Sequence, residues 1–112
     1  MIIVSRKLIK LLTGNFAIAL TVWPFIFIRS KHHSKNHILI NHENIHLRQQ
    51  VELLIVFFYI WYSIEYLVYR MQGKSKLEAY HKISFEKEAY AKESNIHYLK
   101  ERKLFAFIKY LN

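Results

Sequence analysis

Cysteine and aspartate are both absent from this sequence of 112 residues, and glycine and proline are scarce. Without cysteine the chain has no disulfide bond, no thiolate zinc site and no cysteine nucleophile, and it suits a reducing cytoplasm. Without aspartate, every acidic side chain is one of eight glutamates. Two glycines and one proline leave few turn signals, which favours long helices.

Apolar and basic residues, in contrast, are abundant. Hydrophobic residues make up 53% of the chain and aromatic residues 16%, which is enough for residues 1–112 to form a single domain with its own core. The net charge of +9 favours anionic partners, and an anionic membrane surface is one candidate. The basic residues are spread from Arg6 to Lys109 without a nucleic-acid-binding motif, so we expect no specific nucleic-acid binding. The expected location is the cytoplasm or the periphery of a membrane.

One motif carries chemistry: His42-Glu43-Asn44-Ile45-His46, an H-E-x-x-H sequence. On an α-helix, His42 and His46 lie one turn and about 40° apart, so both imidazoles can reach one tetrahedral zinc ion. Glu43 lies about 100° from His42, where its carboxylate can deprotonate a zinc-bound water without being a ligand. The motif therefore predicts one Zn²⁺ per chain, with Glu43 as general base. The alternative is that both histidines are ordinary residues of a helix surface.

The residues before the motif have the pattern of a small sheet. Strand formers occupy residues 18–23 and 25–29, and Pro24 between them suits an edge strand or the start of a strand. An exposed sheet edge beside a zinc helix can bind an extended peptide as an added strand. Residues 1–22 also resemble a signal peptide, but Gly14 interrupts their apolar run and is better interpreted as part of a turn.

The zinc helix should begin near His37, after a cap supplied by Ser34 or Asn36, and reach Gln50. Residues 51–69 then form an apolar segment that is long enough to raise the question of a transmembrane helix. We expect one helix here, on which Glu52, Tyr59, Ser63, Tyr66 and Arg70 fall on a single polar stripe. We therefore expect it to lie against the domain or in a membrane interface, and not to span a bilayer.

A catalytic zinc site needs a third protein ligand, and here only histidine or glutamate can supply it. Glu52 follows His46 by six residues, but on a continuing helix it points about 100° away from the two histidines. His81 and His97 have no supporting pattern. A helix expected from Ser84 to Glu93 offers two further candidates, Glu86 and Glu88.

Glu86 and Glu88 are about 200° apart on that helix, so only one of them can face the zinc. Glu86 lies on the side of Ala89 and Tyr90, which is the expected core-facing side, and Glu88 lies nearer to Lys92. A helix that starts at Ser84 also places Glu86 in its first turn, where the helix dipole favours a carboxylate. We therefore predict Glu86 as the third ligand and keep Glu88 as the alternative.

The order His42-Glu43-x-x-His46 followed by Glu86-x-x-Ala89 resembles the gluzincin zinc metallopeptidases. The similarity is to the single-domain minigluzincins and, more distantly, to the membrane-bound CAAX-prenyl and heat-shock proteases. It implies that His42, His46 and Glu86 bind zinc and that Glu43 is the base. The family pattern continues with Asp, which orients a zinc histidine, where this sequence has Tyr90. The minigluzincin resemblance also suggests latency, in which a chain end covers the cleft.

The expected fold is therefore α+β and mainly helical, with a zinc helix and a glutamate helix packed against a small N-terminal sheet. Residues 98–111 should form a closing amphipathic helix, and its apolar part could cover the cleft. The expected function is zinc-dependent hydrolysis of a peptide or protein, with Tyr80, His81, Tyr90 and His97 as candidates for stabilising the oxyanion. The alternative is a small basic protein without enzymatic activity that binds a membrane surface or a metal.

Overall fold

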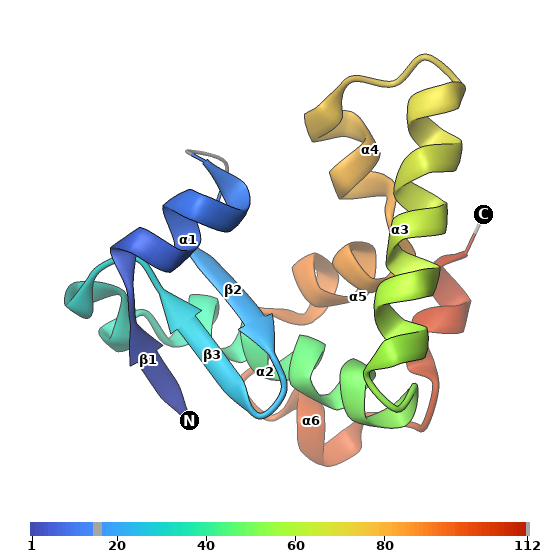
Figure 1. The fold of residues 1–112 in the computed structure, drawn as a ribbon. Coiled ribbons are helices and arrows are strands. Elements are labelled where there is room, and N and C mark those ends of the chain that lie inside the picture. Colours follow the sequence, from blue (N-terminus) through green and yellow to red (C-terminus); the bar gives the residue numbers. More distant parts are fainter. Residues whose placement is uncertain (15–16, 112) are drawn as a thin grey trace.

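A computed structural model describes residues 1–14 and 17–111, and these residues form six α-helices, two 3₁₀-helices and a three-stranded sheet (Figure 1). The mainly helical α+β class predicted from the sequence is confirmed. The elements in chain order are β1 (Ile2–Val4), α1 (Arg6–Thr13), β2 (Ala19–Val22), β3 (Phe25–Ile28), η1 (Lys31–Lys35), α2 (His37–Glu52), α3 (Val56–Met71), α4 (Lys76–Lys82), α5 (Ser84–Lys92), α6 (Tyr98–Glu101) and η2 (Ala106–Tyr110).

The small sheet has the order β1-β3-β2, with β1 parallel and β2 antiparallel to β3. Pro24 lies in the turn that joins β2 to β3, directly before a strand start, and β3 is the central strand. The edge strand beside the motif helix is therefore β2. Its Thr21 hydroxyl and carbonyl contact α2 through Glu43 and Gln50. Strand β1 and helix α1 were not predicted.

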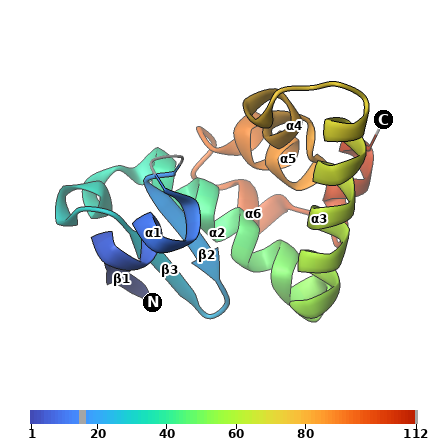
Figure 2. The same cartoon turned by 45° about the horizontal axis from the view of Figure 1, so that its top comes forward.

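Helix α2 begins at the predicted residue because the side chain of Asn36 accepts a hydrogen bond from the backbone N–H of Leu39 at 3.1 Å. Seen in the turned view of Figure 2, α2 lies between the sheet with α1 on one side and the helices α3 to α5 on the other. It therefore carries its side chains between the two halves of the fold.

The prediction of one helix through residues 51–69 is wrong, because the chain breaks between α2 and α3. Leu54 and Ile55 have φ angles of +54° and +64°, and the two helices differ in direction by 112°. The break turns Glu52 away from α3, and its carboxylate accepts a hydrogen bond from Arg102 at 2.6 Å. A polar stripe that runs from Glu52 into α3 therefore does not exist.

No single helix of the described residues is long and apolar enough to cross a membrane. Helices α2 and α3 pass that test together by length and composition alone, as a pair bent by 112°.

The helices α4 and α5 follow the predicted caps with one shift. Ser75 and Glu78 form the predicted capping box, and Gly73 with a φ of +89° follows the end of α3. Ser84 is the first residue of α5 and not its cap. The carboxylate of Glu65 on α3 instead accepts hydrogen bonds from the backbone and hydroxyl of Ser84. Glu65 thereby satisfies a donor at the start of the helix that carries Glu86.

Residues 98–111 do not form the predicted single helix, and none of them lies over the predicted zinc ligands. They form two short helices, and Phe107 is buried between Trp61 and Phe85, with ring centroids 5.1 Å and 4.6 Å away. Arg102 is buried with them and pairs with Glu52 and Glu88. The tail is thus part of the core behind α5, where burial of Phe107 stabilises the fold.

Candidate metal centre

Two helices bring His42, His46 and Glu86 to one point. Nε2 of His42 and Nε2 of His46 on α2 are 3.2 Å apart. Oε1 of Glu86 on α5 is 3.2 Å from the first and 3.0 Å from the second. All three residues are buried, with at most 5% of each exposed. They form the one group of potential metal ligands found among the described residues.

The separations match the requirements of zinc. In a tetrahedral site with bonds of about 2.0–2.1 Å, neighbouring ligand atoms are about 3.3 Å apart. The three donor atoms of His42, His46 and Glu86 thus lie close to one face of such a tetrahedron. Two imidazoles and one carboxylate also make a three-ligand set of the kind found in catalytic zinc sites, which keep a further position open.

The side chains around the histidines fix which ring nitrogen faces that point. Gln49 donates its Nε2 hydrogens to Glu88 at 2.9 Å and to the carbonyl of Phe85 at 3.1 Å, so its Oε1 faces Nδ1 of His46 at 2.8 Å. Because that oxygen can only accept, Nδ1 of His46 carries the hydrogen and Nε2 of the neutral ring has a free lone pair. Oε1 of Glu93 lies 3.1 Å from Nδ1 of His42 and fixes the second ring in the same way.

Glu43 lies beside the group and is not part of it. Its Oε2 is 3.9 Å from Nε2 of His42, and its Oε1 accepts a hydrogen bond from the hydroxyl of Thr21 at 2.8 Å. Burial raises the pKa of Glu43 against the opposing charges of His46 and His42. Strand β2 therefore positions the carboxylate predicted to be the base.

Glu86 is held as an anion. Its second oxygen, Oε2, accepts a hydrogen bond from the hydroxyl of Tyr62 at 2.7 Å, which leaves Oε1 for the histidines. Burial alone would raise the pKa of Glu86, but the charge of His46 and the hydrogen bonds of both histidines hold it well below its usual range. For His46 the effect of burial has the opposite sign, because burial lowers the pKa of a histidine. The charge and hydrogen bond of Glu86 outweigh burial and raise the pKa of His46 to about 9. A divalent cation at this point would displace a proton.

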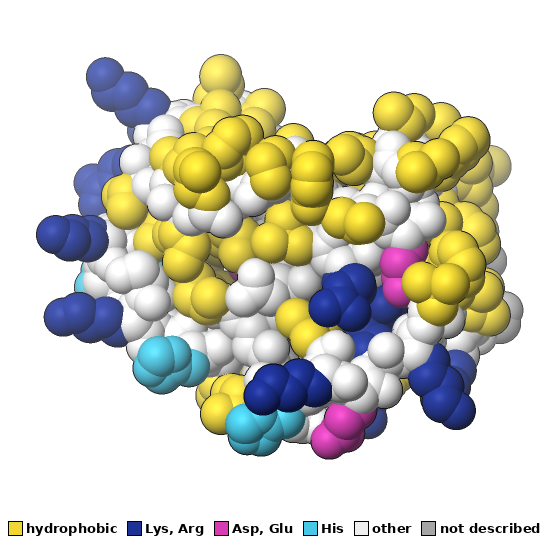
Figure 3. Space-filling model, turned by 90° about the horizontal axis from the view of Figure 1, so that it is seen from below, with side chains coloured by type: hydrophobic (Ala, Val, Ile, Leu, Met, Phe, Trp, Pro, Cys, Tyr) yellow, Lys and Arg dark blue, Asp and Glu magenta, His cyan; other side chains and the backbone are white. Residues whose placement is uncertain are grey.

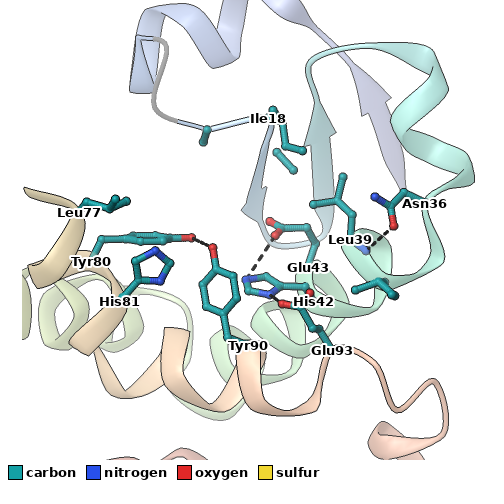
Figure 4. Close-up of a pocket in the computed structure, with 13 residues that line it drawn as sticks. Ile18, Asn36, Leu39, His42, Glu43, Leu77, Tyr80, His81, Tyr90 and Glu93 are labelled. Carbon is teal, nitrogen blue, oxygen red and sulfur yellow. Dashed lines mark hydrogen bonds and ion pairs between the residues drawn. The ribbon is translucent and has the colours of Figure 1, made fainter.

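The group lies at the floor of a cleft between β2 and α4. A cavity of about 330 Å³ extends past His42 to Tyr90, and a second of about 260 Å³ extends past His46 to Tyr62. Ala17, Ala19, Glu43 and Tyr80 line both cavities, so the two meet at Glu43. Figure 4 shows Glu43, His42 and the paired hydroxyls of Tyr80 and Tyr90 around the first cavity. No described residue of the C-terminal tail lines either cavity.

Comparison of the chain with protein-family models, with curated proteins and with solved structures finds no match. The interpretation of this site therefore depends on its own residues.

The structure separates the two glutamates between which the sequence left a choice. Glu86 faces the histidines, whereas Glu88 faces the other side of α5 and accepts hydrogen bonds from Gln49, Tyr98 and Arg102. Of the remaining candidates, Glu52 pairs with Arg102. Tyr80, His81 and Tyr90 line the first cavity, and His97, at the start of α6, lines neither.

Sequence analysis missed four side chains that orient the three ligands or Glu43: Thr21, Gln49, Tyr62 and Glu93. Position 90 has a tyrosine where an aspartate could have oriented His42, and the carboxylate of Glu93 contacts His42 instead. The ring of Tyr90 packs against the ring of His42, with the ring centroids 4.4 Å apart. A signal for Glu93 was present, because it follows Glu86 by seven residues, which is two helical turns and the same face.

Replacing Glu93 with alanine is expected to weaken zinc binding by about 10- to 100-fold, which is the usual cost of losing a partner that orients a zinc histidine. Zinc affinity can be measured by competition with a chromophoric chelator. Glu101→Ala serves as the matched control, because Glu101 is an exposed glutamate on α6. Equal zinc affinity of both variants would show that Glu93 does not orient His42.

Proposed function

We propose that this protein is a zinc-dependent peptidase of gluzincin type, in which His42, His46 and Glu86 bind the metal and Glu43 is the general base. The observation that carries the proposal is the convergence of two correctly oriented imidazoles and one carboxylate beside a glutamate that is not a ligand. Zinc held by these residues would lower the pKa of a bound water to near 7 and polarise a carbonyl.

The sheet edge supports a peptide substrate. Strand β2 is an edge strand of the sheet, and residues from Ala17 to Leu20 line the cleft. The carbonyl of Thr21 on this strand already accepts hydrogen bonds from Gln50 and Tyr59. An extended peptide can therefore pair with the part of β2 that precedes Thr21 as an additional strand, which places its backbone next to Glu43. Main-chain pairing of this kind binds peptides with little dependence on sequence, and the cavities on either side of Glu43 would select their side chains.

The roles of the protein groups follow from their positions. Glu43, held by Thr21, takes a proton from the attacking water and passes it to the leaving amine. Tyr62 holds Glu86 in place through a hydrogen bond to its second oxygen. Of the four residues considered for stabilising the oxyanion, three line the cleft and can donate a hydrogen bond: Tyr80, His81 and Tyr90. We assign the stabilisation of the oxyanion to these three.

Cleavage of an unstructured peptide by the intact chain tests the proposal. Internally quenched peptides of mixed sequence should be cleaved by zinc-loaded protein, should resist cleavage after treatment with a zinc chelator, and should be cleaved again when zinc is restored. The fluorescence increase gives the rate, and mass spectrometry locates the cleaved bond. Zinc-loaded protein that cleaves none of the peptides would favour the alternative of a metal-binding protein without enzymatic activity.

A further inference from the structure

The outward side of α3 is an uninterrupted apolar surface. Seven of its residues have exposed side chains, with exposed fractions from 44% for Val68 to 85% for Met71. Their spacing places all of them within an arc of about 120° on the helix. We refer to these residues as the α3 stripe: Val56, Phe57, Ile60, Ile64, Leu67, Val68 and Met71.

Helix α3 is apolar on its exposed side as well as on its buried side, where Phe58 and Trp61 pack in the core, and it thus differs from an ordinary surface helix. Such a helix buries its apolar face and exposes its charged face. Here the glutamate of the helix, Glu65, turns inward to Ser84, and Tyr62 turns inward to Glu86. The α3 stripe contains no charged residue over its length of about 24 Å. A continuous exposed apolar surface of this kind is typical of a site that contacts a membrane or another protein.

The apolar surface continues across the cleft to α1. Leu12 of α1 and Leu67 of the α3 stripe line opposite sides of a groove of about 620 Å³, and Leu11 beside Leu12 is also exposed. Tyr62 and Tyr80 line this groove and also the cavity at the metal centre, so the groove leads to the cleft. Figure 3, a view from below, shows hydrophobic side chains along its upper and right parts and Lys, Arg and His along its left edge and lower part.

The exposed charge is almost entirely positive. Six of the eight glutamates are buried or partly buried, and Glu78 and Glu101 are the exposed ones in the described part of the chain. Several cations border the apolar surface: Arg70 lies in the last turn of α3, Lys76 lines the groove, and Lys7 and Lys10 lie on α1. The exposed basic residues are Arg6, Lys7, Lys10, Lys31, Lys35, Arg48, Arg70, Lys76, Lys100, Lys103 and Lys109.

We propose that the α3 stripe and the neighbouring leucines of α1 bind the surface of an anionic lipid bilayer. An apolar helix face bordered by Lys and Arg is the pattern of a helix that lies in the plane of the interface. A second copy of the chain fits this surface less well, because pairing would bring two strongly basic molecules together. The groove between Leu12 and Leu67 then opens at the bilayer surface.

Sedimentation with vesicles tests the proposal. We expect the zinc-loaded protein to co-sediment with vesicles of equimolar phosphatidylglycerol and phosphatidylcholine at low salt, and to bind less to phosphatidylcholine alone or at high salt. The double variant Phe57→Glu/Ile64→Glu should lower the partition coefficient by about 100-fold, since burial of each side chain contributes about tenfold or more. Binding is measured without substrate, so its result is independent of the proposed peptidase activity.

A matched control separates the apolar surface from the change in charge. The double variant Ile2→Glu/Ile96→Glu alters the charge equally at two exposed isoleucines on β1 and in the loop before α6, and should bind close to the wild type. Near-UV circular dichroism verifies that both variants are folded. The proposal is overturned if the wild type stays in the supernatant, or if both variants bind equally. It is also overturned if the wild type forms a dimer that Phe57→Glu/Ile64→Glu dissociates and neither protein binds vesicles.

Discussion

The variant Glu43→Gln should retain zinc and its fold but lose peptide cleavage by about 10²- to 10⁴-fold, the usual contribution of a general base. The glutamine has the same shape and can still accept the hydrogen bond from Thr21, but its amide cannot take a proton from water. Rates are compared with internally quenched peptides, and zinc by elemental analysis of the same samples.

The control for this variant is Thr21→Val, which removes the hydroxyl that positions Glu43 and leaves the carboxylate. We expect it to lower the cleavage rate by less than Glu43→Gln does, with unchanged zinc. If Glu43→Gln cleaved peptide at the rate of the wild type, Glu43 would not be the base. If it lost zinc, Glu43 would be a ligand.

The second large effect concerns the third ligand. Glu86→Gln should weaken zinc binding by about 100-fold or more, because it removes the negative charge of the carboxylate whose Oε1 lies 3.0 Å from Nε2 of His46. This loss is above the range for residues that only orient a ligand. Glu88→Gln should still bind zinc, because Glu88 contacts Gln49, Tyr98 and Arg102 on the other side of α5. Zinc affinity is measured for both by chelator competition.

Glu88→Gln should instead unfold at a lower temperature than the wild type. It weakens the buried pair with Arg102, which keeps its pair with Glu52. We therefore expect the loss of stability to stay below the cost of about 3–5 kcal/mol for a buried charge left without a partner. The zinc affinities of Glu86→Gln and Glu88→Gln are therefore measured well below the unfolding temperature of Glu88→Gln. Zinc loss in Glu88→Gln together with retention in Glu86→Gln would assign the ligand to Glu88.

Local periodicity explains what could be predicted from the sequence. A separation of four residues places His42 and His46 together on any helix, and the separation of two places Glu86 and Glu88 on opposite faces. The caps at Asn36 and Ser75 are also local, because each side chain bonds a backbone group three residues away. These features depend on neighbours in the chain, so the sequence is sufficient for them.

The remaining features depend on residues that are far apart in the sequence. The break after Glu52 accompanies its pairing with Arg102, which lies fifty residues further on. The C-terminal helices form where Phe107 meets Phe85 and Trp61. Tyr62 reaches Glu86 because α3 turns back over α5 after the break. Neither hydrophobic periodicity nor propensity reports such pairings, so the helix through 51–69 and the closing helix were mispredicted.

The zinc content of the purified wild type and of His46→Ala tests the central claim most directly. Loosely bound metal is removed first, and zinc is then measured by elemental analysis against protein concentration. A site with His42, His46 and Glu86 as ligands predicts about one zinc per chain in the wild type and almost none in His46→Ala. Full zinc occupancy in His46→Ala, or a folded wild type that binds no zinc when it is supplied, would contradict the account.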